Sequence, residues 1–232
     1  MFDAEGVEAL ADLLTGGLSA PAQEDLVPVL PALRPLVPGG GLQPGSVVCV
    51  EGPGAGSLGL ALIAGAAQDS RPGAGWCAAV GLPEFGVLAA AGMGADLARL
   101  LLVDEPGDRW PDVVAALTEA VDLILVRPGL PPAPAIARRL TATARKHGCA
   151  LAVAGPWDGA RLRLQVAESS WIGLGAGHGH LQGRKARVVA AGRGSAGHGR
   201  DTWIWLPAPD GTITPVETPA ETPARPHLEV VA

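Results

Sequence analysis

The sequence contains no tyrosine, only two lysines and only three cysteines among 232 residues. Cys49, Cys77 and Cys149 each lie in an apolar run, and no two of them have the spacing of a metal-binding pair. We expect them to be reduced thiols of the core, and we expect no metal site. No apolar run approaches the ~18–20 residues that a membrane-spanning helix needs. Acidic residues interrupt the start of the chain, so the sequence predicts no signal peptide and a cytoplasmic protein without membrane contact.

Basic residues are scarce in the first half of the chain, and acidic residues are scarce in residues 127–200. Hydrophobic residues make up 48% of the sequence, which favours a single domain with a substantial core. The formal net charge of −6 hides an asymmetry, because residues 1–126 hold sixteen acidic and four basic residues. Residues 127–200 hold two acidic and twelve basic ones. Either the basic part binds a polyanion or an acidic partner, or the two parts face each other within one domain.

The first segment, residues 1–38, is predicted to be a short helix followed by a connector. Val7, Leu10 and Leu14 share one face of a helix over residues 2–15, and two glycines stop it. Five prolines lie in residues 18–38, which therefore favour an extended connector. The helix is expected to dock on its own core or to reach a neighbouring subunit through its three apolar residues.

The core is predicted to span residues 39–207, with a disordered Pro/Thr/Glu-rich tail at 208–232. Short apolar strands alternate with helices up to residue 154, which predicts an α/β fold with a mainly parallel sheet and helices on both faces. Beyond Trp157 the strands lack intervening helices, which predicts an antiparallel extension of the sheet. The expected strands are 46–51, 76–80, 100–103, 123–126, 150–154, 161–172, 187–191 and 202–206, and the expected helices are 58–68, 84–91, 110–120 and 134–147.

A glycine-rich loop lies between the first core strand and the first core helix. This layout is typical of the nucleotide-binding P-loop, G-x-x-x-x-G-K-[ST]. Leu58 stands at the lysine position, Gly59 at the Ser/Thr position and Ser57 at the second motif glycine. We therefore expect a vestigial phosphate loop with no bound cofactor, or else a tight turn retained for packing. The loop comprises Gly52, Pro53, Gly54, Ala55, Gly56, Ser57, Leu58 and Gly59.

Several segments, in the same order, resemble the RecA-type ATPase core over roughly residues 39–206. Residues 40–48 (GGLQPGSVV) resemble the entry to its first core strand, and residues 93–101 (MGADLARLL) resemble the segment leading into its third strand. Residues 120–126 (AVDLILV) resemble its Walker B strand. The resemblance implies a RecA-like P-loop core with an antiparallel C-terminal extension.

The chain departs from the RecA pattern at the positions that carry the chemistry. Arg127 follows the strand on which the family has a magnesium-binding Asp, and the strand expected to end in a phosphate-sensing Gln ends at residues 154–157 (AGPW). Glu84 is the nearest candidate for the catalytic Glu. Since phosphoryl transfer depends on neutralising the triphosphate with Lys and magnesium, we expect no hydrolysis and assign no catalytic residue.

A short RecA-like chain with a degenerate ATP site resembles the ImuA-type accessory proteins of actinobacterial mutagenesis cassettes. The resemblance implies a non-catalytic scaffold for damage-induced translesion synthesis, associated with the nucleoid during DNA damage. It also implies an ImuB-type inactive Y-family polymerase homologue as partner and, indirectly, an error-prone DnaE-type polymerase. Two alternatives remain: a divergent DNA-dependent ATPase that uses Glu84, and a self-associating regulator that binds or caps RecA filaments through residues 2–15.

Basic residues on glycine-rich loops late in the chain are the best candidates for DNA contact. Such loops can follow a phosphate backbone, and aromatic side chains beside them can stack on bases. Trp157 and Trp171 lie near these loops, whereas Trp203 and Trp205 share a strand face and are expected in a core or interface. The alternative for the basic residues is a solvated strand edge protected by charge. The candidates are Arg184, Lys185, Arg187, Arg193 and Arg200.

Overall fold

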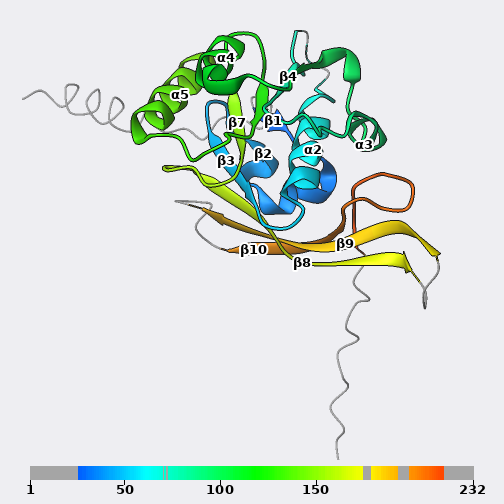
Figure 1. The fold of residues 1–232 in the computed structure, drawn as a ribbon. Helices are drawn as coiled ribbons and strands as arrows, with labels where there is room; N and C mark the ends of the chain where they lie inside the picture. The colour runs from blue at the N-terminus through cyan, green and yellow to red at the C-terminus, as the bar shows by residue number, and fades with distance from the viewer. Residues whose placement is uncertain (1–25, 70, 72, 175–178, 193–198, 217–232) are drawn as a thin grey trace, which may run out of the picture.

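A computed structural model describes residues 26–69, 71, 73–174, 179–192 and 199–216. The fold is a mixed α/β structure around a nine-stranded sheet of order β11-β10-β9-β8-β3-β7-β6-β4-β5 (Figure 1). Strands β5, β4, β6, β7, β3 and β8 pair in parallel, and β9, β10 and β11 continue the sheet antiparallel. The strands are β3 (Val47–Glu51), β4 (Cys77–Val80), β5 (Leu100–Val103), β6 (Leu123–Val126), β7 (Ala150–Ala154), β8 (Leu162–Leu174), β9 (Gly179–Gly192), β10 (Arg200–Trp205) and β11 (Thr214–Pro215).

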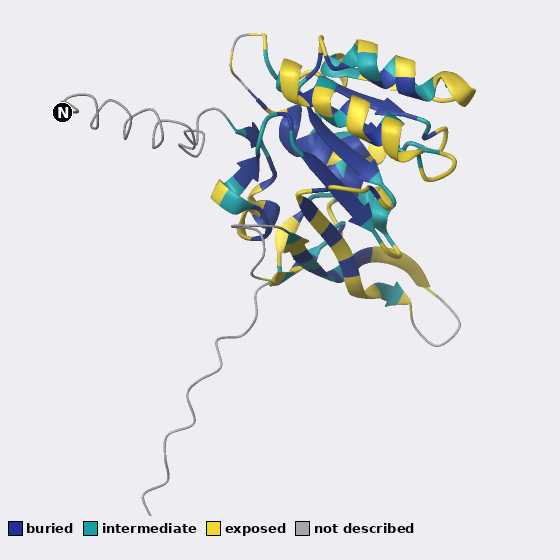
Figure 2. Cartoon of the chain, turned by 90° about the vertical axis from the view of Figure 1, so that its left-hand side faces the viewer, coloured by how far each residue is buried: buried dark blue, intermediate teal, exposed yellow. Residues whose placement is uncertain are grey.

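Helices cover both faces of the parallel part of the sheet, as expected. The side chains of β3 show why, because Val48 and Val50 enter one hydrophobic core while Val47 and Cys49 enter the other. Burial on both faces is what makes parallel strands near-continuous apolar runs, and Figure 2 shows these strands as buried. The helices are α2 (Ala55–Ala66) and α3 (Val87–Gly92) on one side, and α4 (Trp110–Leu117) and α5 (Pro134–His147) on the other.

The antiparallel extension is longer than the sequence predicted. Strands β8 and β9 form a hairpin of 13 and 14 residues that extends beyond the body of the molecule (Figure 1). The pairing register shifts between Val166 and Glu168, so the side chains that face α2 change parity at that point. The expected strand 187–191 covered less than half of β9, because residues 179–185 (GHLQGRK) are mostly polar or glycine and show no apolar strand pattern.

The boundaries predicted at both ends of the core are wrong. The expected connector belongs to the core from Val27 onward, because the short helix η2 (Pro31–Leu36) buries Leu33 and Leu36 completely or nearly so. Pro31 suits the first position of a 3-10 helix, and Pro35 lies inside the same short helix rather than in an extended linker. At the other end, Ile213 is buried and β11 pairs with β10, so the core continues to residue 216. The rest of the expected tail, and the expected helix over residues 2–15, lie outside the described residues.

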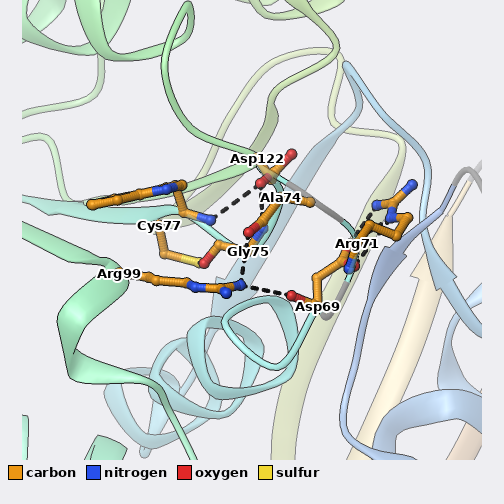
Figure 3. Close-up of polar contacts among 8 residues, drawn as sticks. Asp69, Arg71, Ala74, Gly75, Cys77, Arg99 and Asp122 are labelled. Atoms are coloured by element: carbon orange, nitrogen blue, oxygen red, sulfur yellow. Dashed lines mark hydrogen bonds and ion pairs between the residues drawn. The ribbon is translucent and has the colours of Figure 1, made fainter.

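The loop between α2 and β4 is fixed by polar contacts (Figure 3). The carboxylate of Asp122 accepts hydrogen bonds from the backbone N–H groups of Gly75, at 2.7 Å, and Trp76, at 3.2 Å. The guanidinium of Arg99 donates to the carbonyl oxygens of Asp69, at 2.8 Å, and Ala74, at 2.9 Å. These bonds satisfy buried backbone groups and hold the entry to β4 in place.

All three cysteines are buried and none forms a disulfide, as expected. Burial raises the pKa of the Cys77 thiol to about 12 and that of Cys49 to about 11, so both are uncharged near neutral pH. Within the described part of the chain, no helix combines the length and apolarity that crossing a bilayer requires.

Candidate functional site

The glycine loop joins β3 to α2, where the sequence placed it. Gly52 and Gly54 have φ angles of 82° and 97°, a left-handed conformation that side chains rarely adopt. Gly54 is the N-cap of α2, which begins at Ala55, three residues earlier than expected. Backbone N–H groups of the first helical turn lack intrahelical partners, so this end of α2 retains the geometry of an anion cradle.

The two positions that depart from the Lys-Ser/Thr pair of the P-loop motif are packed against the core. Leu58, at the lysine position, is fully buried in the core beneath α2. Gly59, at the hydroxyl position, lies so close to β6 that an added Cβ would be 2.9 Å from both methyl carbons of Leu125. A serine or threonine here would force α2 away from the sheet. The helix therefore packs more closely than one that presents a magnesium ligand would.

A hollow of about 570 Å³ lies beside the loop, at the carboxyl ends of β3, β6 and β7. Two ion pairs form part of its wall, and each joins residues that are far apart in sequence. Arg127 binds Glu84 through both of its Nη atoms, with 2.6 Å between Nη2 and Oε2. Arg163 Nη1 lies 2.7 Å from Glu51 Oε1. The hollow is lined by Val50, Glu51, Gly52, Ala55, Gly56, Leu82, Glu84, Arg127, Ala154, Gly155, Pro156 and Arg163.

The Glu84–Arg127 pair removes the one candidate for a general base. The hydrogen bonds from Arg127 lower the pKa of Glu84 from its ordinary 4.5 to about 2, and the same contact raises the pKa of Arg127. Glu84 is thus ionised and already bonded at neutral pH. A base that must accept a proton from water needs a pKa nearer the working pH and an open acceptor.

We predict that the Glu84 carboxyl titrates near pH 2 in the wild type and returns toward pH 4.5 in the Arg127→Ala variant. Because the folded-state pKa lies below the unfolded value, the stabilising contribution of the pair is present above pH 4.5 and is lost as the pH falls toward 2. A carboxyl-carbon NMR titration measures this directly. Arg139→Ala, which removes the partner of Asp112 on another surface, is the matched control. An unchanged Glu84 titration in Arg127→Ala would contradict the assignment.

Ion pairs between the acidic first part and the basic second part recur across the fold. Besides the two at the hollow, Arg139 pairs with Asp112 at 3.1 Å, and His147 Nε2 lies 3.7 Å from Glu119. Each of these four contacts joins a residue before position 127 to a residue at or after position 127. Of the two explanations for the charge asymmetry, these contacts favour the one in which the two parts face each other.

The structure corrects the assignment of Arg184 to a DNA surface. Arg184 is 6% exposed, and its Nε donates to the carbonyl of Leu206 at 2.9 Å. Its guanidinium lies 5.4 Å from the ring centroid of Trp171 and touches the loop, because a Cβ added to Gly54 would lie 2.5 Å from Nη1. Arg184 therefore supports the glycine loop from the side of β9. Burial lowers its pKa, although arginine stays charged.

The other DNA candidates differ in how freely they face solvent. Arg187 lies between Glu168, at 2.7 Å, and Asp201, at 3.4 Å, so its charge is already balanced. Lys185 lies 5.0 Å from the ring centroid of Trp205, and Arg200 is exposed at the start of β10. Arg193 lies outside the described residues, as do the expected interaction residues Val7, Leu10 and Leu14.

The tryptophans also depart from the predicted roles. Trp157 is 1% exposed, its indole N–H lies 3.3 Å from Thr141 Oγ1, and its ring meets that of Trp110 edge-on at 6.5 Å. It is therefore a core residue and is not available to stack on bases. Trp171 is 48% exposed, as an interface aromatic would be.

One face of the extension carries aromatic and basic side chains together. We call it the outer sheet face and define it by Lys185, Arg187, Trp203 and Trp205, which are paired across β9 and β10. The residues between them, Ala186 and Ile204, are buried on the opposite face, so these four point the other way. Trp203 is 36% exposed, hence this face is only partly a core surface.

The site contains residues that sequence reasoning missed. Arg163 and Glu51 belong to the hollow, yet 112 residues separate them. They meet because β8 lies beside β3, with Cys49 opposite Arg163 in the register. The only local signal was the position of Glu51 directly before the loop.

Two comparisons place the chain among known proteins. Residues 35–159 match the family model described as the MT3502 N-terminal domain. The chain is also similar to a protein of Mycobacterium tuberculosis described as uncharacterized protein Rv3395c, with 37% identity over 157 residues, 67% of this chain and 69% of the relative. The family match covers the loop and β3 to β7 and ends before β8, so the long hairpin lies outside it.

Proposed function

The chain belongs to the MT3502 N-terminal domain family, and on that premise we propose that it is a non-catalytic accessory protein of a DNA-damage-induced translesion synthesis complex. The observation that carries the proposal is the hollow beside the glycine loop, whose charged side chains are paired with one another. Leu58 and Gly59 are packed into the core there, and Arg127 holds Glu84 where a RecA-type enzyme would hold magnesium and a free carboxylate. A triphosphate at this place would meet neither lysine nor metal.

The RecA-type part of the proposal draws support from the topology. The loop strand β3 lies inside the sheet, and the antiparallel strands follow β8 on one side of it. This agrees with the order that the sequence motifs led us to expect for a RecA-like core. The accessory role follows from the resemblance to ImuA-type proteins, whose partners are an ImuB-type Y-family polymerase homologue and, indirectly, a DnaE-type polymerase.

Co-purification of the full chain with a folded ImuB-type protein tests the accessory role. We expect a stable complex that survives gel filtration and that forms equally well with the Glu84→Gln variant, because binding does not depend on ATP chemistry. A clean negative with both proteins folded would refute the proposed partner. The alternative in which residues 2–15 cap a RecA filament concerns a segment outside the described residues.

We further propose that DNA, if bound, contacts the outer sheet face. Aromatic side chains beside basic ones are the platform on which single strands stack, and Trp203 and Lys185 provide both. Arg200 pairs with the buried Ala190 and has the strand parity of Ile204, so it points to the opposite face. Arg184 and Arg187 contribute little, since one is buried and the other is paired with two carboxylates.

The prediction for DNA binding concerns its salt dependence. Replacing Lys185 by alanine should reduce the slope of log affinity against log salt by about 1, because each lost phosphate contact releases about one counterion fewer. Fluorescence anisotropy with a labelled single strand measures the slope. Arg138→Ala, an exposed arginine on α5, should leave it unchanged. Equal slopes in wild type and Lys185→Ala would exclude this face.

A further inference from the structure

Strand β5 ends the sheet and exposes apolar side chains. Within the described residues it pairs only with β4, in a regular parallel register from Leu100 to Val103. Leu101 is 36% exposed and Leu102 is 43% exposed, whereas the four residues of β4 are all buried. The neighbouring Leu97 is 40% exposed. The edge of the sheet is therefore a row of leucines open to solvent.

This edge is short, but it lacks the charged residues, proline and bulge that usually prevent strands from adding to a sheet. Protected edges carry charged residues, proline or a bulge, and β5 consists of three leucines and a valine without a bulge. The backbone N–H of Gly81 donates to the carbonyl of Val103 at 2.9 Å, so that carbonyl faces β4. Because successive residues of a strand direct their N–H and C=O groups to opposite sides, the N–H and C=O of Leu102 face away from β4 and toward solvent.

An acidic hollow adjoins the carboxyl end of this edge. It has a volume of about 680 Å³, and the three exposed carboxylates of Asp104, Glu105 and Asp108 form part of its wall. On the opposite wall, Leu130 is 81% exposed. Its position directly after β5 means that a segment paired with the edge would bring its own end beside these carboxylates.

Two basic side chains near this surface are engaged elsewhere, which leaves the exposed Arg109 beside the three carboxylates. Arg99, directly before β5, turns away toward the carbonyl oxygens of Asp69 and Ala74 (Figure 3). Arg127, which also lines the acidic hollow, is held by Glu84. The carboxylates at the end of the edge are thus left as a negative patch that favours a cationic partner.

We propose that β5 and the acidic hollow together bind an extended segment of another protein, which adds to the sheet as a tenth strand. Its side chains alternate between apolar and polar, and lysine or arginine at one end lies beside Asp104, Glu105 and Asp108. Backbone pairing would supply affinity and the basic end would supply direction and specificity. This goes beyond the proposed function, which names no surface for a protein partner, and it does not depend on the pathway.

The charge of the chain's own segments argues against an intramolecular or self-paired occupant. Residues 1–25 contain six acidic residues and no basic one, so they would be repelled by the carboxylates at the hollow. A second copy paired edge to edge would run antiparallel, so each negative patch would meet the Asp96–Arg99 pair of the other copy, which carries no net charge. A basic segment from a different protein is the occupant that matches both the apolar edge and its acidic end.

The test uses the full chain and a labelled synthetic peptide of alternating valine and threonine that ends in Lys-Arg. We expect backbone NMR shifts at Leu102 and Asp104 on binding. Affinity should fall at least about tenfold when Lys-Arg is replaced by Glu-Glu, and by a similar factor when a central proline removes a backbone donor. The Leu102→Lys variant, and separately Asp104→Asn with Glu105→Gln, should weaken binding of the basic peptide.

Leu88→Lys is the matched control, because Leu88 is 87% exposed but lies on α3. It should bind the peptide as the wild type does. Equal affinity for all three peptides, or absence of shifts at Leu102, would overturn the proposal. So would a wild-type dimer that becomes monomeric in Leu102→Lys, because the occupant would then be a second copy. Circular dichroism of each variant shows that the fold is retained.

Discussion

Replacing Trp157 by alanine is expected to lower the free energy of unfolding by about 3–5 kcal/mol, the range for removal of a fully buried large aromatic side chain. The side chain is 1% exposed, packs edge-on against Trp110 and is hydrogen-bonded to Thr141. Its removal leaves a cavity, while the Thr141 hydroxyl keeps its hydrogen bond to the Ala137 carbonyl. Denaturant unfolding followed by circular dichroism measures the loss.

Trp171→Ala is the comparison that separates packing from base stacking. Trp171 is 48% exposed, and its ring contact with Arg184 is worth about 1 kcal/mol at such a site. We therefore expect a small change in stability. A Trp157→Ala variant with wild-type stability and weakened DNA binding would contradict the core assignment and restore the base-stacking role.

Replacing Gly65 by alanine is expected to destabilise the protein by about 1–3 kcal/mol, even though alanine is the better helix former by ~1 kcal/mol. An added Cβ would lie 2.6 Å from Val29 Cα and Leu30 N, which are backbone atoms and cannot rotate away. The clash would push residues 26–30 off α2. Thermal and denaturant unfolding both report on the loss.

Gly56→Ala is the matched substitution on the same helix. A Cβ at Gly56 meets nothing within 4 Å, so only the helix-forming gain remains, a few tenths to ~1 kcal/mol. Opposite signs for the two variants would show that the segment around Val29 is part of the core. If the Gly65→Ala variant were as stable as Gly56→Ala, residues 26–30 would not be packed against α2 and would be a connector, as the sequence predicted.

The sequence predicted the central elements well where apolar runs coincide with burial on both faces. The bounds of β6, α5 and β7 were predicted without error, because each is a continuous apolar strand or a strongly amphipathic helix with clear ends. The bounds of β5 were also predicted without error, although its leucines are exposed at the sheet edge. The ends of the core were missed because prolines outweighed the apolar pattern in η2, where Leu33 and Leu36 recur at the spacing of one 3-10 turn.

The site was harder to predict because it depends on contacts between distant strands. Arg184 faces the glycine loop because it has the same strand parity as the buried Ala186 and Val188 on β9, and its charge led the prediction away from this alternation. The Arg127–Glu84 pair joins the ends of two neighbouring parallel strands, β6 and β4. Their adjacency follows from sheet order, so each residue was noted separately and their contact was not foreseen.

The measurement that tests the central claim most directly is magnesium-dependent ATP turnover by the full chain, with single-stranded DNA and an ImuB-type partner present. The account predicts that the wild type shows no turnover beyond that of the Glu84→Gln variant. Leu58 gives the phosphates no lysine, Gly59 gives magnesium no ligand oxygen, and Arg127 is bound to Glu84. Turnover in the wild type that is lost in Glu84→Gln would contradict it and make the chain a divergent ATPase.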